Sequence, residues 1–283
     1  MGFITGILAG IFTSLQNSQF RKLPEITNLA LNGIRFAANI PILALLVTLF
    51  GIWQVPPTPF FIILLASLPL EIAIAFCYVR AFQLSPQSLV GPLFSMSVVF
   101  LVPLSYFLVG DTPSVLGLIG ITLSLTGTLA LGWNLKRPQI KSILRNIFKE
   151  KGSYYILTAA LLAAGTVTLA KLSYRYIPPL LSAFYLVSGL TMVYLPFAMK
   201  VGLKTINQRK KDLTLMSVAD AFVNVFHYIG LSLLPAAYFI SLKRSSVLFD
   251  VLFGKFVHHE NHFKTRLIGA TLMVGGIILI SLA

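Results

Sequence analysis

Three charged side chains stand inside a stretch of sequence that is otherwise apolar enough to cross a lipid bilayer. The stretch covers residues 236–257 and carries Lys243, Arg244 and Asp250. At about 1.5 Å per residue, a helix that starts at residue 236 places Lys243 roughly 10 Å inside a hydrocarbon core about 30 Å thick. Charges at such a depth are costly and usually face the interior of a helix bundle or a wet cavity. We therefore predict that these residues belong to a functional site.

The types and the spacing of these charges favour binding of an acidic group. On a continuous helix, Lys243, Ser246 and Asp250 would share one face, with Arg244 turned by about 100°. Arginine recognises carboxylate or phosphate with paired hydrogen bonds, and lysine acts as a point charge. Two alternatives stay open. The cations could extend to lipid headgroups, or they could form ion pairs with Asp220 and Asp250.

Other apolar stretches carry polar residues at helical spacing. A stripe of this kind cannot face hydrocarbon without leaving polar groups unpaired, so we expect the stripes to converge inside the bundle. The predicted substrate-binding residues are Arg35, Tyr78, Asn224, Lys243 and Arg244. The predicted ion-coupling residues, which can take up and release a proton, are Glu71, Asp220 and His227. Hydrogen bonds between helices are the alternative explanation for the Asn and Ser residues, and His227 could simply end its polar stripe.

A short cluster has the residue types of a metal site but not its spacing. It consists of His258, His259, Glu260, Asn261 and His262. The zinc pattern His-Glu-x-x-His puts both histidines on one helix face, and here the second histidine comes one residue early. We predict no metal and no cofactor. The sequence also shows no glycine-rich phosphate loop, no Ser-His-Asp set and no cysteine cluster, so we do not expect an enzyme.

The elements that position these residues are expected to be membrane-spanning helices. Of the 283 residues, 57% are hydrophobic and 11% are charged, whereas a soluble domain has about a quarter of its residues charged. We predict an all-α integral membrane protein with ten transmembrane helices. Their expected ranges are 3–20, 27–50, 59–82, 87–109, 114–133, 153–173, 179–199, 213–234, 236–257 and 267–283.

The sequence also repeats itself. FCYVRAF at 76–82 resembles FHYIGLS at 226–232. We predict a first repeat over 1–134, a basic connecting loop over 135–152 and a second repeat over 153–283. Because each repeat holds an odd number of spans, the second must enter the membrane upside down relative to the first. Such inverted five-helix repeats are typical of secondary transporters, whose solute binds near the middle of the membrane.

The net charge of +14 comes mainly from lysines and arginines in the connections between the apolar stretches. This distribution indicates orientation in a membrane rather than binding to nucleic acid. Most of the 22 basic residues fall on one side of the predicted topology, and the positive-inside rule makes that side cytoplasmic. The long basic loops 134–152 and 200–212 would then lie in the cytoplasm, and both termini outside.

The segment 238–280 carries the residues that point to a known family. A serine pair at 245–246 is followed by Gly254, Glu260 and the run Arg-Leu-Ile-Gly-Ala at 266–270. This order resembles the drug/metabolite transporter superfamily, in particular its ten-span members built from two EamA-type repeats. The resemblance extends over essentially the whole chain. Family members usually have both termini in the cytoplasm, opposite to the charge bias found here.

The resemblance implies a secondary transporter that moves a small solute by alternating access and performs no chemistry. Members of the sugar-phosphate and nucleotide-sugar branch carry a Lys-Arg pair in the ninth span, to which Lys243–Arg244 is similar. This similarity favours a small anionic metabolite, moved with protons or by exchange. The alternatives are an exporter of amino acids or other neutral or zwitterionic metabolites, a flippase for lipid-linked sugars, and an intramembrane enzyme. The expected location is a bacterial cytoplasmic (inner) membrane, with the oligomeric state open and a monomer sufficient.

Overall fold

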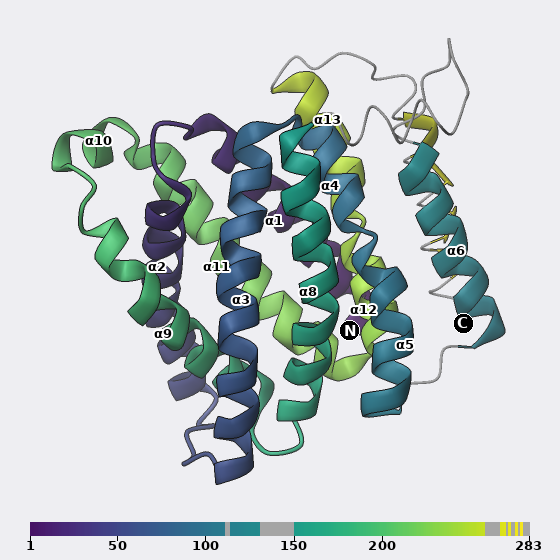
Figure 1. The fold of residues 1–283 in the computed structure, drawn as a ribbon. Coiled ribbons are helices and arrows are strands. Elements are labelled where there is room, and N and C mark those ends of the chain that lie inside the picture. The colour runs from purple at the N-terminus through teal and green to yellow at the C-terminus, as the bar shows by residue number, and fades with distance from the viewer. Residues whose placement is uncertain are drawn as a thin grey trace.

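The computed structural model describes residues 1–110, 114–130, 150–257, 267–269, 271–272, 275–276 and 278–279. These residues form helices and no strands, which agrees with the predicted all-α class. Figure 1 shows the helices packed side by side as a bundle. Within the described ranges, five helices are long and apolar enough to cross a membrane, namely α2 (Asn28–Leu49), α3 (Thr58–Leu84), α8 (Lys151–Ser173), α9 (Pro179–Ala198) and α11 (Lys210–Leu233).

The remaining helices are shorter or more polar. α1 (Gly2–Lys22) is long but holds a run of buried polar residues, and α6 (Val115–Ala130) is apolar. The short helix α10 (Leu203–Gln208) lies between α9 and α11, at the outer edge of the bundle. Where an uninterrupted helix corresponds to an expected span, its two ends lie within a few residues of the expected positions. This holds for α1, α2, α3, α6, α8, α9 and α11.

Two predicted helices are interrupted, and here the prediction of continuous spans is wrong. The expected span 87–109 is split into α4 (Gln87–Phe94) and α5 (Ser97–Val109), and the expected span 236–257 into α12 (Ala236–Lys243) and α13 (Ser246–Phe256). Each break is a tight turn whose amides bond to carbonyls three residues back, a pattern that often marks a mid-helix hinge.

The two breaks occupy equivalent positions in the predicted repeats. In the first, the Met96 amide donates to the Leu93 carbonyl at 3.1 Å, and in the second the Ser245 amide donates to the Leu242 carbonyl at 3.0 Å. Neither turn contains glycine or proline. The second break falls directly after Lys243, so that Arg244 lies in the turn itself.

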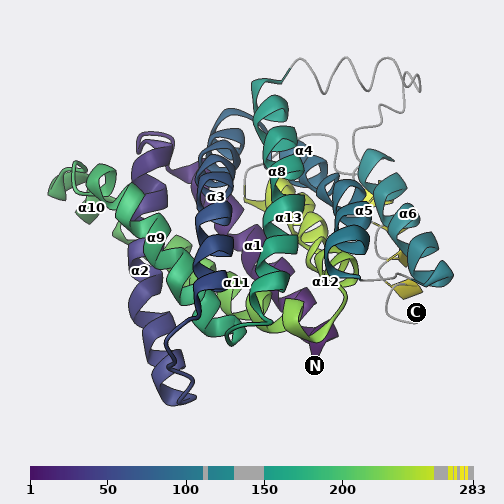
Figure 2. The same ribbon diagram turned by 60° about the horizontal axis from the view of Figure 1, so that its bottom comes forward.

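The packing of the helices also follows the repeat. α1 packs mainly against α11, α13 and α12, and its counterpart α8 packs mainly against α3, α5 and α4. α2 packs against its own counterpart, α9. In Figure 1, α1 rises from the N-terminus while α8 descends, and Figure 2 again places both in the middle of the bundle.

Glycines allow two of these helix pairs to approach closely. A Cβ atom on Gly33 in α2 would lie 2.9 Å from the carbonyl carbon of Tyr194 in α9. A Cβ atom on Gly10 in α1 would lie 2.9 Å from both the Lys243 carbonyl oxygen and the Ser246 amide. The backbone of α1 therefore passes directly beside the break between α12 and α13.

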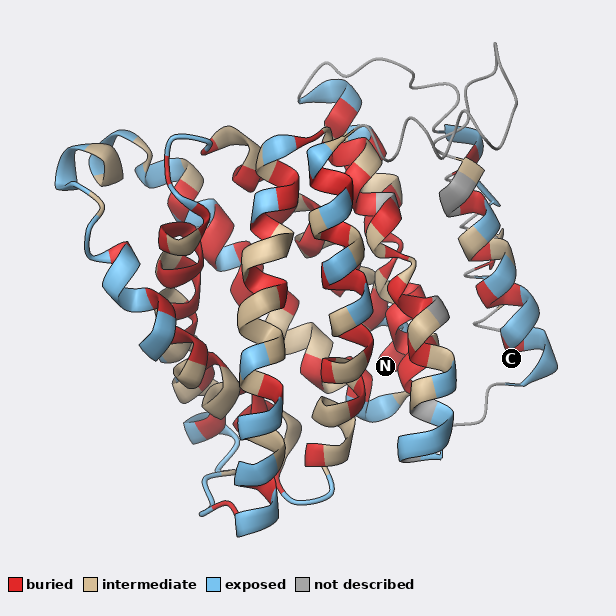
Figure 3. Cartoon of the chain, in the orientation of Figure 1, coloured by how far each residue is buried: buried red, intermediate tan, exposed pale blue. Residues whose placement is uncertain are grey.

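Figure 3 shows buried residues on the inward faces and exposed residues outside. The outside is itself rich in large apolar side chains, for example Ile62, Leu65 and Met192, which are 65%, 68% and 80% exposed. The interior, by contrast, holds many buried polar groups, including Asn32, Arg35, Asn39 and Asp220. Apolar outside and polar inside is the distribution expected of a bundle whose outer surface contacts lipid.

Candidate functional site

A cavity of about 180 Å³ lies between the central helices, with space for on the order of ten water molecules. Residues from α1, α2, α3, α4, α8, α9, α11 and α12 line it, together with Arg244 in the turn after α12. All of the residues predicted to bind substrate or couple to ions are among them, namely Arg35, Glu71, Tyr78, Asn224, His227, Asp220, Lys243 and Arg244. Stripes that are far apart in the sequence thus meet in one space, as their spacing predicts. Their functional roles stay predictions.

Asp220 is the best-connected acid at this cavity. Arg35 Nη1 lies 3.0 Å from Asp220 Oδ1 and forms a buried ion pair with it. Asn39 donates to Asp220 Oδ2 at 2.5 Å, Asn224 donates to the same oxygen at 3.4 Å, and Gln16 donates to Oδ1. Both carboxylate oxygens therefore accept hydrogen bonds, and the charge of Asp220 is balanced by Arg35.

Lys243 and Arg244 are held differently. Across the part of the chain that the structure describes, no carboxylate oxygen lies within ion-pair distance of either side chain. Lys243 Nζ lies 3.0 Å from His227 Nδ1. Arg244 donates to Ser97 Oγ at 2.7 Å and lies over the ring of Phe94, 4.2 Å from its centroid. The ion-pair partner of Asp220 is therefore Arg35, and neither Lys243 nor Arg244 forms an ion pair with it.

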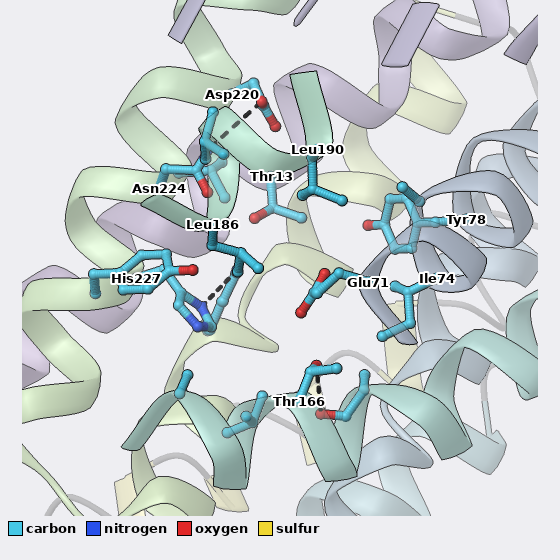
Figure 4. Close-up of a pocket in the computed structure, with 18 of the residues that line it drawn as sticks. Thr13, Glu71, Ile74, Tyr78, Thr166, Leu186, Leu190, Asp220, Asn224 and His227 are labelled. Carbon is cyan, nitrogen blue, oxygen red and sulfur yellow. Dashed lines mark hydrogen bonds between the residues drawn. The ribbon is translucent and has the colours of Figure 1, made fainter. Parts of the chain in front are cut away.

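Glu71 provides a carboxylate on the opposite wall. Figure 4 shows its side chain directed into the same space as Asn224 and His227. In the described ranges it has no lysine or arginine within ion-pair distance. Glu71 also lines a second, water-sized cavity of about 20 Å³, together with Ser67, Ser173, Ser182 and other residues. It therefore lies where the two cavities meet.

Asp250 does not line the cavity that Lys243 lines, and the turn at 244–245 lies between the two residues. Its Oδ1 accepts hydrogen bonds from Ser14 at 2.7 Å, Gln87 at 2.6 Å and Asn17 at 3.3 Å. This second cluster, Asp250 with Ser14, Asn17 and Gln87, lies outside the lining of the central cavity. Tyr78 connects the two, since its hydroxyl donates to Asn17 Oδ1 at 2.9 Å.

Sequence reasoning missed the contribution of α1. Gln16 reaches the Asp220 cluster, Ser14 and Asn17 reach the Asp250 cluster, and Thr13 lines the cavity. The signal was present, because residues 13–19 form a dense polar run in a helix that is apolar before it. Such a run inside a membrane span can be accommodated only by facing other helices.

The histidine-rich cluster at 258–262 lies outside the described residues. Within the described ones, no group of three or more His, Cys, Asp or Glu residues is arranged to hold a metal ion.

Comparisons with known proteins agree with this arrangement. A model of the EamA-like transporter family matches residues 1–133 and again residues 150–282. A solved structure described as "Crystal structure of protein" is 16% identical, covers 98% of this chain and 98% of its own, and superposes with a TM-score of 0.67. At that identity the likeness shows a shared fold. A search of curated proteins gave no match.

Proposed function

The chain belongs to the EamA-like transporter family, and from this premise we propose that it moves a small anionic metabolite across a membrane by alternating access. The family makes it an integral membrane protein with a transporter fold. The solute would bind in the central cavity and be released on the other side after the two halves rearrange. The observation that carries the proposal is the pair Lys243 and Arg244, which line the cavity without an ion-pair partner among the described residues.

The charge balance of the cavity supports an anion. Its lining contains the cations Arg35, Lys243 and Arg244 and the carboxylates Glu71 and Asp220. The ion pair between Arg35 and Asp220 removes one charge of each sign. Among the lining residues two cations then face one carboxylate, while Asp250 acts on Arg244 from outside the lining. The lining itself keeps an excess of positive charge for an acidic group of the solute. In this arrangement Arg35 borders the site, while Lys243 and Arg244 make the direct contacts, with Asn224 and Tyr78 as polar neighbours.

Glu71 is better placed than Asp220 to couple transport to protons. Asp220 is fixed by Arg35 and three amide donors. Glu71 has no lysine or arginine within ion-pair distance among the described residues, and it borders a second cavity with hydroxyl groups along it. We assign the coupling proton to Glu71 and a supporting role to Asp220, with His227 acting through its contact to Lys243.

The topology is part of the proposal. Ten spans in two inverted five-helix repeats, over 1–134 and 153–283, are supported by the paired family matches, the equivalent helix breaks and the opposite courses of α1 and α8. The basic loops 134–152 and 200–212 would face the cytoplasm of a bacterial cell with this protein in its inner membrane. The described residues that line the cavity come from one chain, and we take a monomer as the transporting unit.

The second candidate function is export of a zwitterion such as an amino acid. It is favoured by Glu71, which could bind an ammonium group while Lys243 and Arg244 bind the carboxylate. A flippase for lipid-linked sugars would need a lateral opening to the bilayer, and an intramembrane enzyme would convert its solute rather than move it unchanged.

We expect a thermal-shift screen of the purified protein in detergent to separate these candidates. Anionic, zwitterionic, cationic and neutral metabolites are added one class at a time, each over a wide concentration range. A ligand at 100 times its Kd stabilises the folded state by about 2.7 kcal/mol, which is readily measured. The proposal predicts stabilisation by anions. Hits confined to zwitterions would favour the second candidate, and hits confined to cations or neutral solutes would contradict both.

Replacement of Glu71 by glutamine is expected to abolish proton-driven uptake while sparing exchange of labelled for unlabelled solute. The amide keeps the shape of the side chain but cannot release a proton, so only the step that carries the proton is lost. Uptake and counterflow are measured in liposomes with and without a pH gradient. Thr13→Val is the matched control, because Thr13 lines the cavity and its hydroxyl bonds to the Ala9 carbonyl of its own helix. Retention of gradient-driven uptake in Glu71→Gln would remove Glu71 from coupling.

A further inference from the structure

A second hollow lies on the outside of the bundle, away from the central cavity. It occupies about 380 Å³ between α2 and α11 and beneath α10. Its lining is mainly apolar, and we call it the α2–α11 groove. The residues that form it are Ile34, Ala38, Ile42, Ile206, Lys210, Leu213, Thr214, Ser217 and Val218. None of them lines the central cavity.

The position of the groove decides what can fill it. α2 and α11 are both long and apolar enough to cross a membrane. A groove between two such helices on the outer surface opens toward the acyl chains of the bilayer, and water has no favourable place on its apolar walls. Thr214 and Val218 are exposed on this surface. A hydrocarbon chain is the chemical match for the walls.

One end of the groove carries a positive charge. Lys210 is the first residue of α11, is exposed, and is the charged member of the lining. It belongs to the basic connection 200–212, where Lys211 follows it and Lys204 precedes it. The neighbouring Arg209 is engaged elsewhere, at 2.5 Å from Glu25 and 3.8 Å from Asp212. An apolar slot that ends at a lysine has the pattern of a lipid tail joined to a phosphate.

We propose that the α2–α11 groove binds an anionic phospholipid, with one acyl chain along α2 and α11 and the phosphate at Lys210. A net negative headgroup is favoured over a zwitterionic one because the surrounding connection is strongly basic. The inner wall of the groove adjoins the Asp220 cluster, since Ser217 precedes Asp220 by one helical turn and Ala38 precedes Asn39. A bound lipid would therefore support the helix pair that holds the buried ion pair.

The test adds defined lipids to delipidated protein in detergent. Phosphatidylglycerol and phosphatidylcholine with identical acyl chains are titrated separately, and both thermal stability and bound lipid by native mass spectrometry are recorded. The variants are Lys210→Gln, which removes the charge, and Thr214→Trp, which fills the groove from its exposed edge. Lys255→Gln, an exposed lysine at the end of α13, is the matched control.

Phosphatidylglycerol is expected to stabilise the wild type and Lys255→Gln more than phosphatidylcholine does. In Lys210→Gln the apparent affinity for phosphatidylglycerol should fall about fivefold. This factor corresponds to the contribution that one lysine makes to binding near an anionic membrane surface. In Thr214→Trp the tightly bound lipid should be lost. Equal effects of the two lipids in the wild type, or an unchanged response to phosphatidylglycerol in Lys210→Gln, would overturn the proposal even if Thr214→Trp fails to fold. Neither readout depends on which solute is transported.

Discussion

Simultaneous replacement of Lys243 and Arg244 by alanine is expected to abolish uptake of an anionic solute while leaving the folded protein stable. A hydrogen bond to a charged group contributes about 1.5–3 kcal/mol, so loss of two cations weakens binding by about 3–6 kcal/mol. Even the lower value is more than a hundredfold in Kd. Because no described carboxylate forms an ion pair with either residue, their removal leaves no such acid without its partner.

The measurement is uptake of labelled solute by purified protein in liposomes, together with thermal stability in detergent. Lys255→Ala removes a lysine from α13 at an exposed position and should leave uptake unchanged. Normal uptake by the double variant would show that Lys243 and Arg244 do not bind the solute. A large loss of stability in the double variant would assign them a structural role instead.

Removal of the Asp220 carboxylate is expected to cause the largest loss of stability of any single substitution in the cavity. Asp220→Ala leaves Arg35, 7% exposed, buried without its counter-ion and also removes the acceptor for three amide donors. Breaking a buried ion pair by removing one partner costs about 3–5 kcal/mol. The free energy of unfolding in a mixed detergent–denaturant titration gives the measurement.

Asp212→Ala is the matched comparison, because it lies in the same helix and pairs with Arg209 near the surface. An ion pair of that kind contributes about 0–1 kcal/mol. Combining Asp220→Ala with Arg35→Met should recover part of the stability, since the stranded charge is then removed as well. If Asp220→Ala cost no more than Asp212→Ala, the buried ion pair would not hold α2 and α11 together.

The residues of the cavity could be predicted because the helices that carry them are surrounded by lipid rather than by water. In a soluble protein, a polar residue every third or fourth position on one face indicates only an exposed surface. In a membrane span it indicates an inward face, so Arg35 on α2, Glu71 on α3 and Asp220 on α11 could each be assigned to one common space. The family could be predicted from the serine-rich segment near residue 245, and the family match confirms it.

The helix breaks and the hydrogen-bond partners could not be predicted in the same way. The turns at 95–96 and 244–245 contain no glycine or proline, so nothing local separates Lys243 from Asp250. Which donor satisfies which acid depends on contacts across more than 200 residues, such as that from Gln16 to Asp220. Periodicity assigns a residue to a face, but the choice among the neighbours on that face is made by packing.

The exchange of first helices between the two halves has a consequence for how this chain assembles. The main partners of α1 come from the second half, and those of α8 from the first. A half expressed alone would therefore expose the face on which the missing helix belongs, with its polar groups uncovered in lipid. The two halves are interlocked rather than merely adjacent, so neither completes its fold until synthesis has delivered the other. An ancestor with a single repeat would have needed a second copy to supply the missing helix.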